Sequence, residues 1–576
     1  MIDPVTLAVI NGRLEQIADE MDATLFRSAF NPIIAEAHDA SHGLYDAGTG
    51  ATLIQGKSGL PVFVGAMSFA VKLVIDKNAR DGDLGPGDTY IFNDPYEGGT
   101  HLSDFKLVRP FYRNGAIFCF LASVGHWHDV GGNVPGNYNP VATESFQEGM
   151  LIPPVKLIEE GTLRQDIVDI LQANSRLPGS LYGDLNGQIN ALDLGEQRLQ
   201  DLLNEYGDEQ VKAALTELQN RAAQLMRSNI LELPDGTFVC DDWLDNDGIV
   251  DEPLKIALDL TIRNDRMTLD FSRTSLACAG PVNISRSTAV ASIYVALKHV
   301  FTDVPANAGV LEPIDIVIPE DTLLSVGAPK PVGGYTETIL RVIDVVFGAI
   351  AQAAPERSNG CAYGTINALS LAGHRRNGKR WVMFSFFGGG HGGHPEGDGL
   401  NHGNAPISTA TIPPAEILEA AYPMFFRSWA LRADSGGPGR HRGGLGALYE
   451  IELLEEDADV FLFGERGRFA PQGVAGGDAG ALNRFQYEQP DGLHEPPMKS
   501  KMVGIKINRG QYLRLETPGG GGYGCAGERD PAAVAEDVRL GYVTAGAAKT
   551  EYGVVVDDEG QLDGKATEAL RLGGSA

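Results

Sequence analysis

The sequence predicts a mixed α+β protein with several domains, built from glycine-rich β sheets and several long helices. Its 576 residues exceed the ~250 to 300 residues that a single hydrophobic core usually serves. Glycine is abundant, with 72 residues, and gathers in clusters such as "FFGGGHGGHPEGDG" and "TPGGGGYG", which indicate ordered turns and close backbone approaches. Helical and strand-like hydrophobic patterns both occur along the chain.

Helices are predicted where apolar residues recur three and four positions apart. The N-terminal segment shows this spacing after Pro4, with Leu7, Ile10, Leu14, Ile17, Met21 and Leu25. The same spacing predicts helices over 196–229 (interrupted near Gly207), 287–301 and 336–353. Asp530 and Pro531 are typical N-cap and first-turn residues of one more helix.

Strands and loops are expected over residues 35–109, where short apolar runs lie between turn residues. "AIFCFLASV" (116–124) is typical of a buried strand that ends at Gly125, and the "RND" in "LKIALDLTIRNDRMTLDFS" predicts a hairpin. We expect three parts: an N-terminal metal-site domain with a helical end (1–230), a β-rich middle segment (231–330) and a glycine-rich α+β C-terminal domain (331–576).

The excess of acidic residues argues against negatively charged binding partners. Asp and Glu number 76 against 46 Lys and Arg, and the formal net charge of -30 disfavours nucleic acid and anionic membrane surfaces. The longest apolar runs are shorter than the ~18 to 20 residues of a membrane span, and "MIDPVTLAV" lacks the basic start of a signal peptide. The five cysteines form no C-x-x-C pair. We therefore expect a soluble, cytoplasmic protein with free thiols.

One motif imitates a nucleotide site. "GATLIQGKSG" resembles the phosphate-binding G-x-x-x-x-G-K-[ST] loop, but Ala51 stands at its first glycine position. That loop leads into a helix, whereas Gly59 and Pro61 are expected to interrupt a helix here. We therefore expect ATP to bind elsewhere.

Two H-x-x-D segments carry the strongest chemical signal: His101 with Asp104 in "NDPYEGGTHLSD", and His126 with Asp129 in "GHWHDVGG". Residues three apart can face the same side of a turn, so the two segments could converge on one ion. Imidazole and carboxylate suit Zn, Mn or Fe, and three protein ligands leave positions for water or substrate. The alternative is that the histidines are hydrogen-bonded structural residues and the acids cap turns.

Two glycine-rich segments offer weaker signals. His391, His394, Glu396, Asp398 and His402 could bind a metal, although a loop with solvated polar residues is the favoured interpretation. In "SGGPGRHRGGLG", Arg440 and Arg442 would suit either carboxylate binding or an internal ion pair.

The chain resembles the hydantoinase B/oxoprolinase family, which includes a subunit of acetone-type carboxylases, over nearly its whole length. Seven motifs carry the resemblance in order: "YIFNDPYEGGTHLSD", "GHWHDVGG" followed by "EGMLIPPVKL", "DVPANAGVLEPIDIVIPEDTLL", "TETILRVIDVVFGAIAQA", "SGGPGRHRGGLG", "FGERGRFAPQGVAGG" and "TPGGGGYGCAGERDPAAVAEDVRLGYVT". The resemblance implies an ATP-dependent heteromeric enzyme in the cytoplasm. A hydantoinase A-like, actin-fold subunit would bind ATP and Mg and phosphorylate the substrate, in a heterotetramer of two plus two chains.

The resemblance also implies roles for residues of this chain. The metal ligands map onto His101, Asp104 and His126, whereas the family pattern does not demand a histidine at His128. Asp129 matches that pattern, and the acid, acid, serine pattern near the N-terminus is kept as Glu36, Asp39 and Ser41. Asp129 would either support the metal ligands or act as an acid or base, and Asp129, Asp39 and Glu148 are the candidates for moving protons.

Three functions are compatible with these residues. The first is hydrolysis of a cyclic amide (a lactam, hydantoin or oxoproline), with water added to the substrate that the partner has phosphorylated. The second is ATP-dependent carboxylation of a ketone with bicarbonate, although acetone carboxylase subunits of this type are typically longer. The third is a non-catalytic scaffold, which the two H-x-x-D pairs disfavour. Tyr335, Ile339 and Leu340 replace polar residues of relatives, so either the substrate is less polar or these residues are core.

Overall fold

The computed structural model describes residues 2–408, 411–557 and 559–573. The chain divides into two compact units. Unit 1 comprises Met1–Thr237, Asp259–Val342 and Ile407–Pro413, and unit 2 comprises Phe238–Leu258, Ile343–Pro406 and Pro414–Ala576. Helices and four β sheets confirm the predicted mixed α+β class.

The main sheet of unit 1 has seven strands in the order β2-β1-β5-β4-β3-β6-β7, and its neighbours are antiparallel. Its longest strands, β4 and β5, are joined by the two-residue turn Asn114-Gly115, in which both residues have positive φ. The strands are β1 (Ala40–Asp46), β2 (Thr52–Gln55), β3 (Thr89–Phe92), β4 (Asp104–Arg113), β5 (Ala116–His126), β6 (Val155–Glu159) and β7 (Thr162–Leu163).

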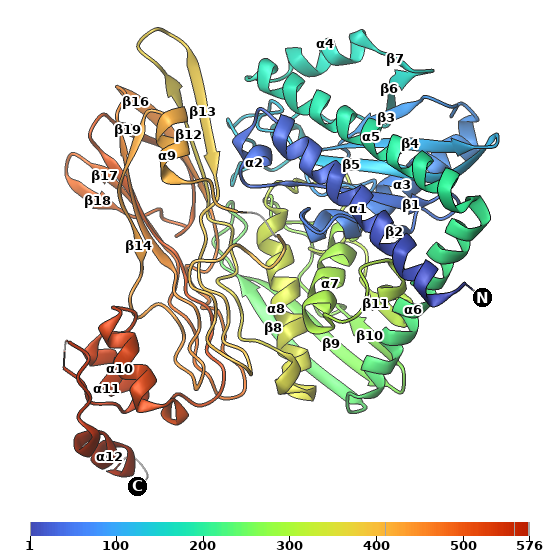
Figure 1. The fold of residues 1–576 in the computed structure, drawn as a ribbon. Coiled ribbons are helices and arrows are strands. Elements are labelled where there is room, and N and C mark those ends of the chain that lie inside the picture. The colour runs from blue at the N-terminus through green and yellow to red at the C-terminus, as the bar shows by residue number, and fades with distance from the viewer. Residues whose placement is uncertain (1, 409–410, 558, 574–576) are drawn as a thin grey trace. The chain divides into compact units, whose positions relative to one another are not determined.

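Helices cover both faces of this sheet. Figure 1 shows α1 (Pro4–Ser28) beside α5 (Pro178–Tyr206), and both pack on one face. Asp3 caps α1, and the predicted stripe from Leu7 to Leu25 is buried in the core. The other face holds α3 (Pro61–Asp81) and behind it α7 (Arg286–Val300). Shorter helices are α2 (Pro32–Ala35) and α4 (Gln165–Ala173), with 3-10 turns η1 (Ser145–Gln147) and η2 (Ala308–Leu311).

Helix α3 corrects the expectation of strands and loops over 35–109. Pro61 does not interrupt a helix but begins one, because the first helical position needs no amide hydrogen. The helix contacts both the sheet and α7, and a Cβ added to its Gly65 would lie 2.8 Å from Cα of Ala291. A helix packed on two sides is apolar on two sides, so it lacks the one-sided pattern by which helices are recognised.

The other predicted helices are present, with different bounds. The helical stretch near 196–229 consists of α5 and α6 (Asp208–Leu231), divided at Gly207 as expected, and α5 begins earlier, at Pro178. Helix α8 covers Tyr335–Ala353. A second sheet has the order β11-β10-β9-β8, with the predicted hairpin turning at Asn264. Its strands are β8 (Gly236–Leu244), β9 (Leu254–Arg263), β10 (Arg266–Asp270) and β11 (Ile314–Val317).

Unit 2 contains two antiparallel sheets around a core of buried apolar residues. Their orders are β13-β12-β16-β19 and β14-β15-β20-β17-β18. The strands are β12 (Ala368–His374), β13 (Arg380–Ser385), β14 (Met424–Leu431), β15 (Ala447–Leu453), β16 (Asp457–Phe463), β17 (Arg484–Gln489), β18 (Gly492–His494), β19 (Lys501–Asn508) and β20 (Tyr512–Glu516). The helical elements are η3 (Pro355–Arg357), α9 (Ala415–Ala421), η4 (Ala526–Glu528), α10 (Pro531–Arg539), α11 (Ala545–Tyr552) and α12 (Gly564–Gly573).

Glycine-rich segments of unit 2 lie against one another backbone to backbone. We call the residues Gly390, Gly392, Gly443, Gly444 and Gly519–Gly522 the glycine array. A Cβ added to any of them would lie between 1.8 and 2.1 Å from a backbone oxygen of another segment. The clusters therefore provide close packing, as their composition indicated, and leave no room for a side chain.

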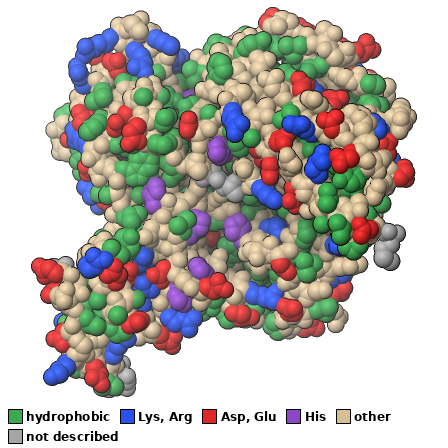
Figure 2. All heavy atoms as spheres, in the orientation of Figure 1, with side chains coloured by type: hydrophobic (Ala, Val, Ile, Leu, Met, Phe, Trp, Pro, Cys, Tyr) green, Lys and Arg blue, Asp and Glu red, His purple; other side chains and the backbone are tan. Residues whose placement is uncertain are grey.

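On the face that Figure 2 shows, the acidic side chains do not gather in one patch. Figure 2 shows Asp and Glu side chains spread over both units on the visible face, with Lys and Arg among them. Among the described helices, none is both long and apolar enough to cross a bilayer.

Candidate metal centre

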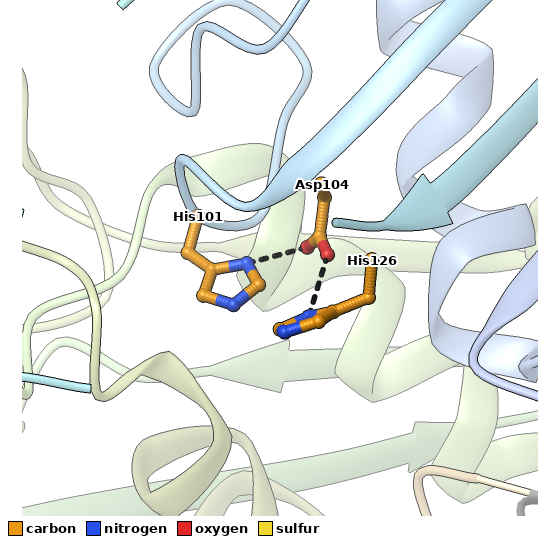
Figure 3. Close-up of side chains that lie close together, drawn as sticks. All are labelled: His101, Asp104 and His126. Atoms are coloured by element: carbon orange, nitrogen blue, oxygen red, sulfur yellow. Dashed lines mark hydrogen bonds and ion pairs between the residues drawn. The ribbon is translucent and has the colours of Figure 1, made fainter. Parts of the chain in front are cut away.

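Strand pairing brings His101, Asp104 and His126 together (Figure 3). Asp104, the first residue of β4, pairs directly with His126, the last residue of β5, so their side chains share one face of the sheet. His101 lies in the turn before β4, where its carbonyl accepts the amide hydrogen of Asp104. Nδ1 of His101 is 2.7 Å from Oδ2 of Asp104, and Nδ1 of His126 is 3.4 Å from Oδ1.

These three side chains fit a divalent cation. One potential ligand atom from each lies within 4.8 Å of the others, and the side chains are at most 2% exposed. Within the described ranges, Nε2 of His101 is buried without a hydrogen-bond partner. Burial alone would raise the pKa of Asp104, but His101 and His126 outweigh it and hold the pKa well below its ordinary value. The carboxylate is therefore charged, as a metal ligand must be.

Aromatic rings enclose the centre. The ring of Tyr335, the first residue of α8, is 4.7 Å from the ring of His101, and the ring of Tyr138 is 5.6 Å from it. Both tyrosines are buried. The sequence left undecided whether Tyr335 lines the substrate pocket or belongs to the hydrophobic core, and the structure places it beside the candidate metal centre. Nothing in the sequence pointed to Tyr138.

Asp39 lies close to the centre, as its candidacy for proton transfer requires. Its Oδ2 is 3.9 Å from Nδ1 of His126, and its carbonyl accepts the amide hydrogen of His126. Burial raises the pKa of Asp39 to about 7, while His126 lowers it and Asp104 raises it. A carboxyl that titrates near neutral pH suits acid–base work.

Lys106 is a polar residue of this region that sequence reasoning missed. It follows Asp104 by two positions on β4 and so shares its face, whereas Phe105 turns to the other face and stacks on Trp127 at 3.8 Å. Lys106 is only 1% exposed. Burial lowers its pKa to about 8, against the opposing effects of Asp104 and Asp94. The alternation of β4 was a signal that could have found this residue.

Asp129 does not share the environment of Asp104. Its buried carboxylate lies 3.0 Å from Nη1 of Arg176 and accepts amide hydrogens from Arg176, Gly131 and Gly136. The two H-x-x-D segments thus differ, because His126 still belongs to a strand while Asp129 lies in the loop beyond it. These contacts favour a positioning role for Asp129. His128 is buried in the same loop.

Glu148 binds the backbone just before α8 begins. Its side chain accepts the amide hydrogens of Val332 at 3.0 Å and Gly333 at 2.7 Å, just before Tyr335. Burial raises the pKa of Glu148 to about 8, although the two amides lower it. Glu148 is therefore placed to hold Tyr335 against His101 rather than to touch the three side chains itself.

The histidine-rich segment of unit 2 has other partners. Trp429 donates its Nε1 hydrogen to His402 at 3.1 Å, and Asp398 accepts two hydrogen bonds from Arg529, at 2.6 and 2.7 Å. Arg442 lies 3.6 Å from Asp537, which is the internal ion pair that the sequence left open. Among the described residues, only His101, Asp104 and His126 form a group that could hold a metal ion.

Comparison with known proteins places the chain in a family. The hydantoinase B/oxoprolinase family model matches residues 3–526. The chain belongs to the hydantoinase B/oxoprolinase family. This membership confirms the resemblance inferred from the seven motifs.

Proteins of known name or structure resemble this chain in sequence, in fold or in both. The caprolactamase subunit beta of Pseudomonas jessenii is 32% identical over 584 residues, which cover 99% of each chain. A chain in the crystal structure of the ATP-dependent caprolactamase from the same organism has a TM-score of 0.89 at 32% identity, covering 99% of this chain and 100% of that one. An acetone carboxylase chain shares the fold, with a TM-score of 0.92 at 21% identity over 99% of this chain and 83% of that one.

Proposed function

We propose that this chain is the metal-dependent catalytic subunit of an ATP-dependent cyclic amide hydrolase. It adds water to a lactam, hydantoin or oxoproline-type ring whose oxygen has been phosphorylated by a hydantoinase A-like, actin-fold partner in a heterotetramer of two plus two chains. The observation that carries the proposal is the buried group of His101, Asp104 and His126 in a chain that resembles a caprolactamase subunit throughout.

The chemistry follows from what phosphorylation does to an amide. A phosphorylated oxygen turns the poorly electrophilic carbonyl carbon into that of an imidate phosphate. The oxygen of water forms a bond to this carbon, and the ring C–N bond breaks as the nitrogen takes a proton and leaves as an amine. The remaining acyl phosphate reacts with a second water and gives a carboxylate and inorganic phosphate. ATP thus supplies the driving force and the leaving group.

His101, Asp104 and His126 would hold the divalent cation, of which Zn, Mn and Fe suit imidazole and carboxylate donors. Such a cation lowers the pKa of a water molecule from 15.7 towards ~7 and polarises oxygen. Asp39, with its pKa near 7, accepts the proton that the attacking water loses and returns a proton to the leaving nitrogen. Tyr138 and Tyr335 shield the reacting atoms from bulk solvent, and Glu148 keeps Tyr335 in place.

Metal analysis tests the centre. The purified chain is expected to bind about one divalent ion, which His101→Ala loses and the matched variant His494→Ala, altered at an exposed histidine of unit 2, retains. At a metal concentration of 100 times Kd, binding adds about 2.7 kcal/mol to the free energy of unfolding. For roughly 300 residues this raises the Tm by about 4 °C. An unchanged metal content and Tm in His101→Ala would refute the assignment.

The reaction is tested with the partner subunit present. The complex is incubated with ATP and lactams or ketones, with and without labelled bicarbonate. ATP-dependent ring opening without label in the product supports hydrolysis. Label retained in a ketone-derived product would identify a ketone carboxylase instead, which is the alternative consistent with the shared acetone carboxylase fold. Full activity of the complex with His101→Ala would leave only a scaffold role for this chain.

A further inference from the structure

A buried amine lies beside the candidate metal centre without a bonding partner. Nζ of Lys106 is fully enclosed, and within the described residues no polar atom accepts a hydrogen bond from it. Asp94 and Asp104 are the nearby acids, yet neither comes within the 4.0 Å of an ion pair in the described structure. An enclosed amine without acceptors is costly, which points to an acceptor that arrives with a ligand.

Glycine leaves room at the tip of this amine. A Cβ added to Gly99 would lie 2.7 Å from Nζ of Lys106 and 2.4 Å from the carbonyl oxygen of Asp94. Any larger residue at position 99 would therefore press on the amine. Gly99 also stands two residues before His101, so the space it leaves adjoins the candidate metal centre.

Three hydroxyl groups gather at the carbonyl oxygen of Gly99. Its carbonyl oxygen lies 3.0 Å from the hydroxyl of Thr288, 3.3 Å from that of Ser287 and 3.4 Å from that of Ser285. A carbonyl oxygen has two lone pairs, so it accepts from two of the three at most. The hydroxyl of Ser285 also lies 3.0 Å from those of Ser287 and Thr288, so the third hydrogen bonds a neighbouring hydroxyl until a ligand offers another acceptor.

These hydroxyls stand at the N-terminus of α7, a helix of 15 residues whose N-cap, Ser285, makes no side-chain capping bond. The N-terminus of a helix carries a partial positive charge and free amide hydrogens, which favour anions. Amine, hydroxyls and helix N-terminus are all donors, and together they match the oxygens of a phosphoryl group.

We propose that Lys106, Ser285, Ser287 and Thr288 form a phosphoryl subsite that binds the phosphate carried by the activated substrate. The subsite rests on the proposed function, in which the substrate reaches this chain as an O-phosphorylated amide. Lys106 neutralises charge on the phosphoryl oxygens, and the hydroxyls fix their direction. We place the carbon bonded to the phosphoryl oxygen toward His101, which follows Gly99 by two residues.

Direct binding measurements on the metal-loaded full-length chain test the subsite. Titration calorimetry is performed with inorganic phosphate, the released product, and with methyl phosphate, whose phosphoryl group is still joined to carbon through oxygen. Lys106→Met is expected to weaken both by about tenfold to a hundredfold, because a charge-assisted hydrogen bond is lost. Lys77→Met, which removes an amine paired with Asp81 elsewhere in unit 1, is expected to change neither.

Two outcomes would overturn the proposal: Lys106→Met binding methyl phosphate within twofold of the parent, or losing affinity for inorganic phosphate alone. Thr288→Val provides a second variant in case Lys106→Met does not fold. It is expected to weaken methyl phosphate about threefold to tenfold, and unchanged binding would count against the subsite.

Phosphate binding by this chain and ring opening by the complex, measured separately, distinguish this proposal from the proposed function. If phosphate binding depends on Lys106 but the complex opens no cyclic amide, the subsite stands and the proposed function fails. If the complex opens lactams while Lys106→Met binds both phosphates like the parent, the proposed function stands and the subsite fails. Lys106→Met is expected to keep its metal ion, because His101, Asp104 and His126 are unchanged.

Discussion

Replacing Gly520 with alanine tests the packing of the glycine array. The new Cβ would lie 2.0 Å from the carbonyl oxygen of His391, whereas ordinary contact begins near 3.4 Å. The two backbones would have to separate by about 1.4 Å. Gly520 donates to Gly444 at 3.0 Å and accepts from Gly437 at 2.8 Å, so the separation strains both bonds. Overpacking and two weakened bonds together cost about 3–5 kcal/mol.

Urea unfolding followed by tryptophan fluorescence measures this cost. Of the four tryptophans, Trp243, Trp381 and Trp429 belong to unit 2, so the signal reports mainly on that unit. The control is Gly546→Ala in the exposed part of α11, where the nearest atom is 3.7 Å from the new Cβ. This control is expected to be neutral or to stabilise by up to about 1 kcal/mol. If the two variants unfold within 0.5 kcal/mol of each other, roughly the effect of an ordinary surface substitution, the described packing is wrong.

Three further predictions concern the candidate centre. Since the pKa of Glu148 is raised to about 8, this carboxyl should lower the free energy of unfolding as pH rises from about 4.5 to 8, by up to about 1.4 kcal/mol per pH unit. The raised pKa of Asp39 adds a slope of the same sign, so in urea unfolding the slope of Glu148→Gln should be smaller than that of the parent, and an equal slope would contradict the shift. Arg176→Met leaves the buried carboxylate of Asp129 without its cation and should lower the free energy of unfolding by about 2–3 kcal/mol in the same urea assay. The double variant Arg176→Met/Asp129→Asn should regain part of this loss. A change below about 0.5 kcal/mol in Arg176→Met would show that the pair contributes little. Asp39→Asn should lower kcat by about 10² to 10⁴ while the metal content stays constant, and a kcat near that of the parent would remove Asp39 from the proton transfers.

Helices with one apolar stripe were predictable from the sequence, and those packed on two sides were not. The stripe of α1 shows its buried face directly, and Gly207 marks the break between α5 and α6. Helix α3 is covered on both sides, so its apolar residues follow no single face. The cuts near 230 and 330 stay predictions.

The sequence was enough to select the candidate ligand residues, but it did not show which side chains contact one another in the folded chain. Spacing and resemblance together selected His101, Asp104 and His126, which the strand pairing of β4 and β5 places side by side. The same spacing treated Asp129 as the equal of Asp104, although a loop directs it to Arg176. Tyr138 reaches the site through the tertiary fold, on which spacing carries no information, whereas the alternation of β4 could have placed Lys106 on the face of Asp104. Their roles, like those of the proposed ligands, stay predictions.

The Asn114-Gly115 turn lies far along the β4–β5 ladder from the candidate centre, yet it influences how the two strands are aligned there. In an antiparallel ladder, sliding one strand by a single residue carries its side chains to the opposite face of the sheet. Asp104 and His126 are the last pair of the β4–β5 ladder, and their alignment is set near its other end by the turn and by the register shift between Phe111 and Tyr112. If that register shift stays as it is, one residue inserted in the turn would part the two side chains without altering either. Metal affinity would then report on the register of β4 and β5, and sequence changes far from the ion could abolish metal binding.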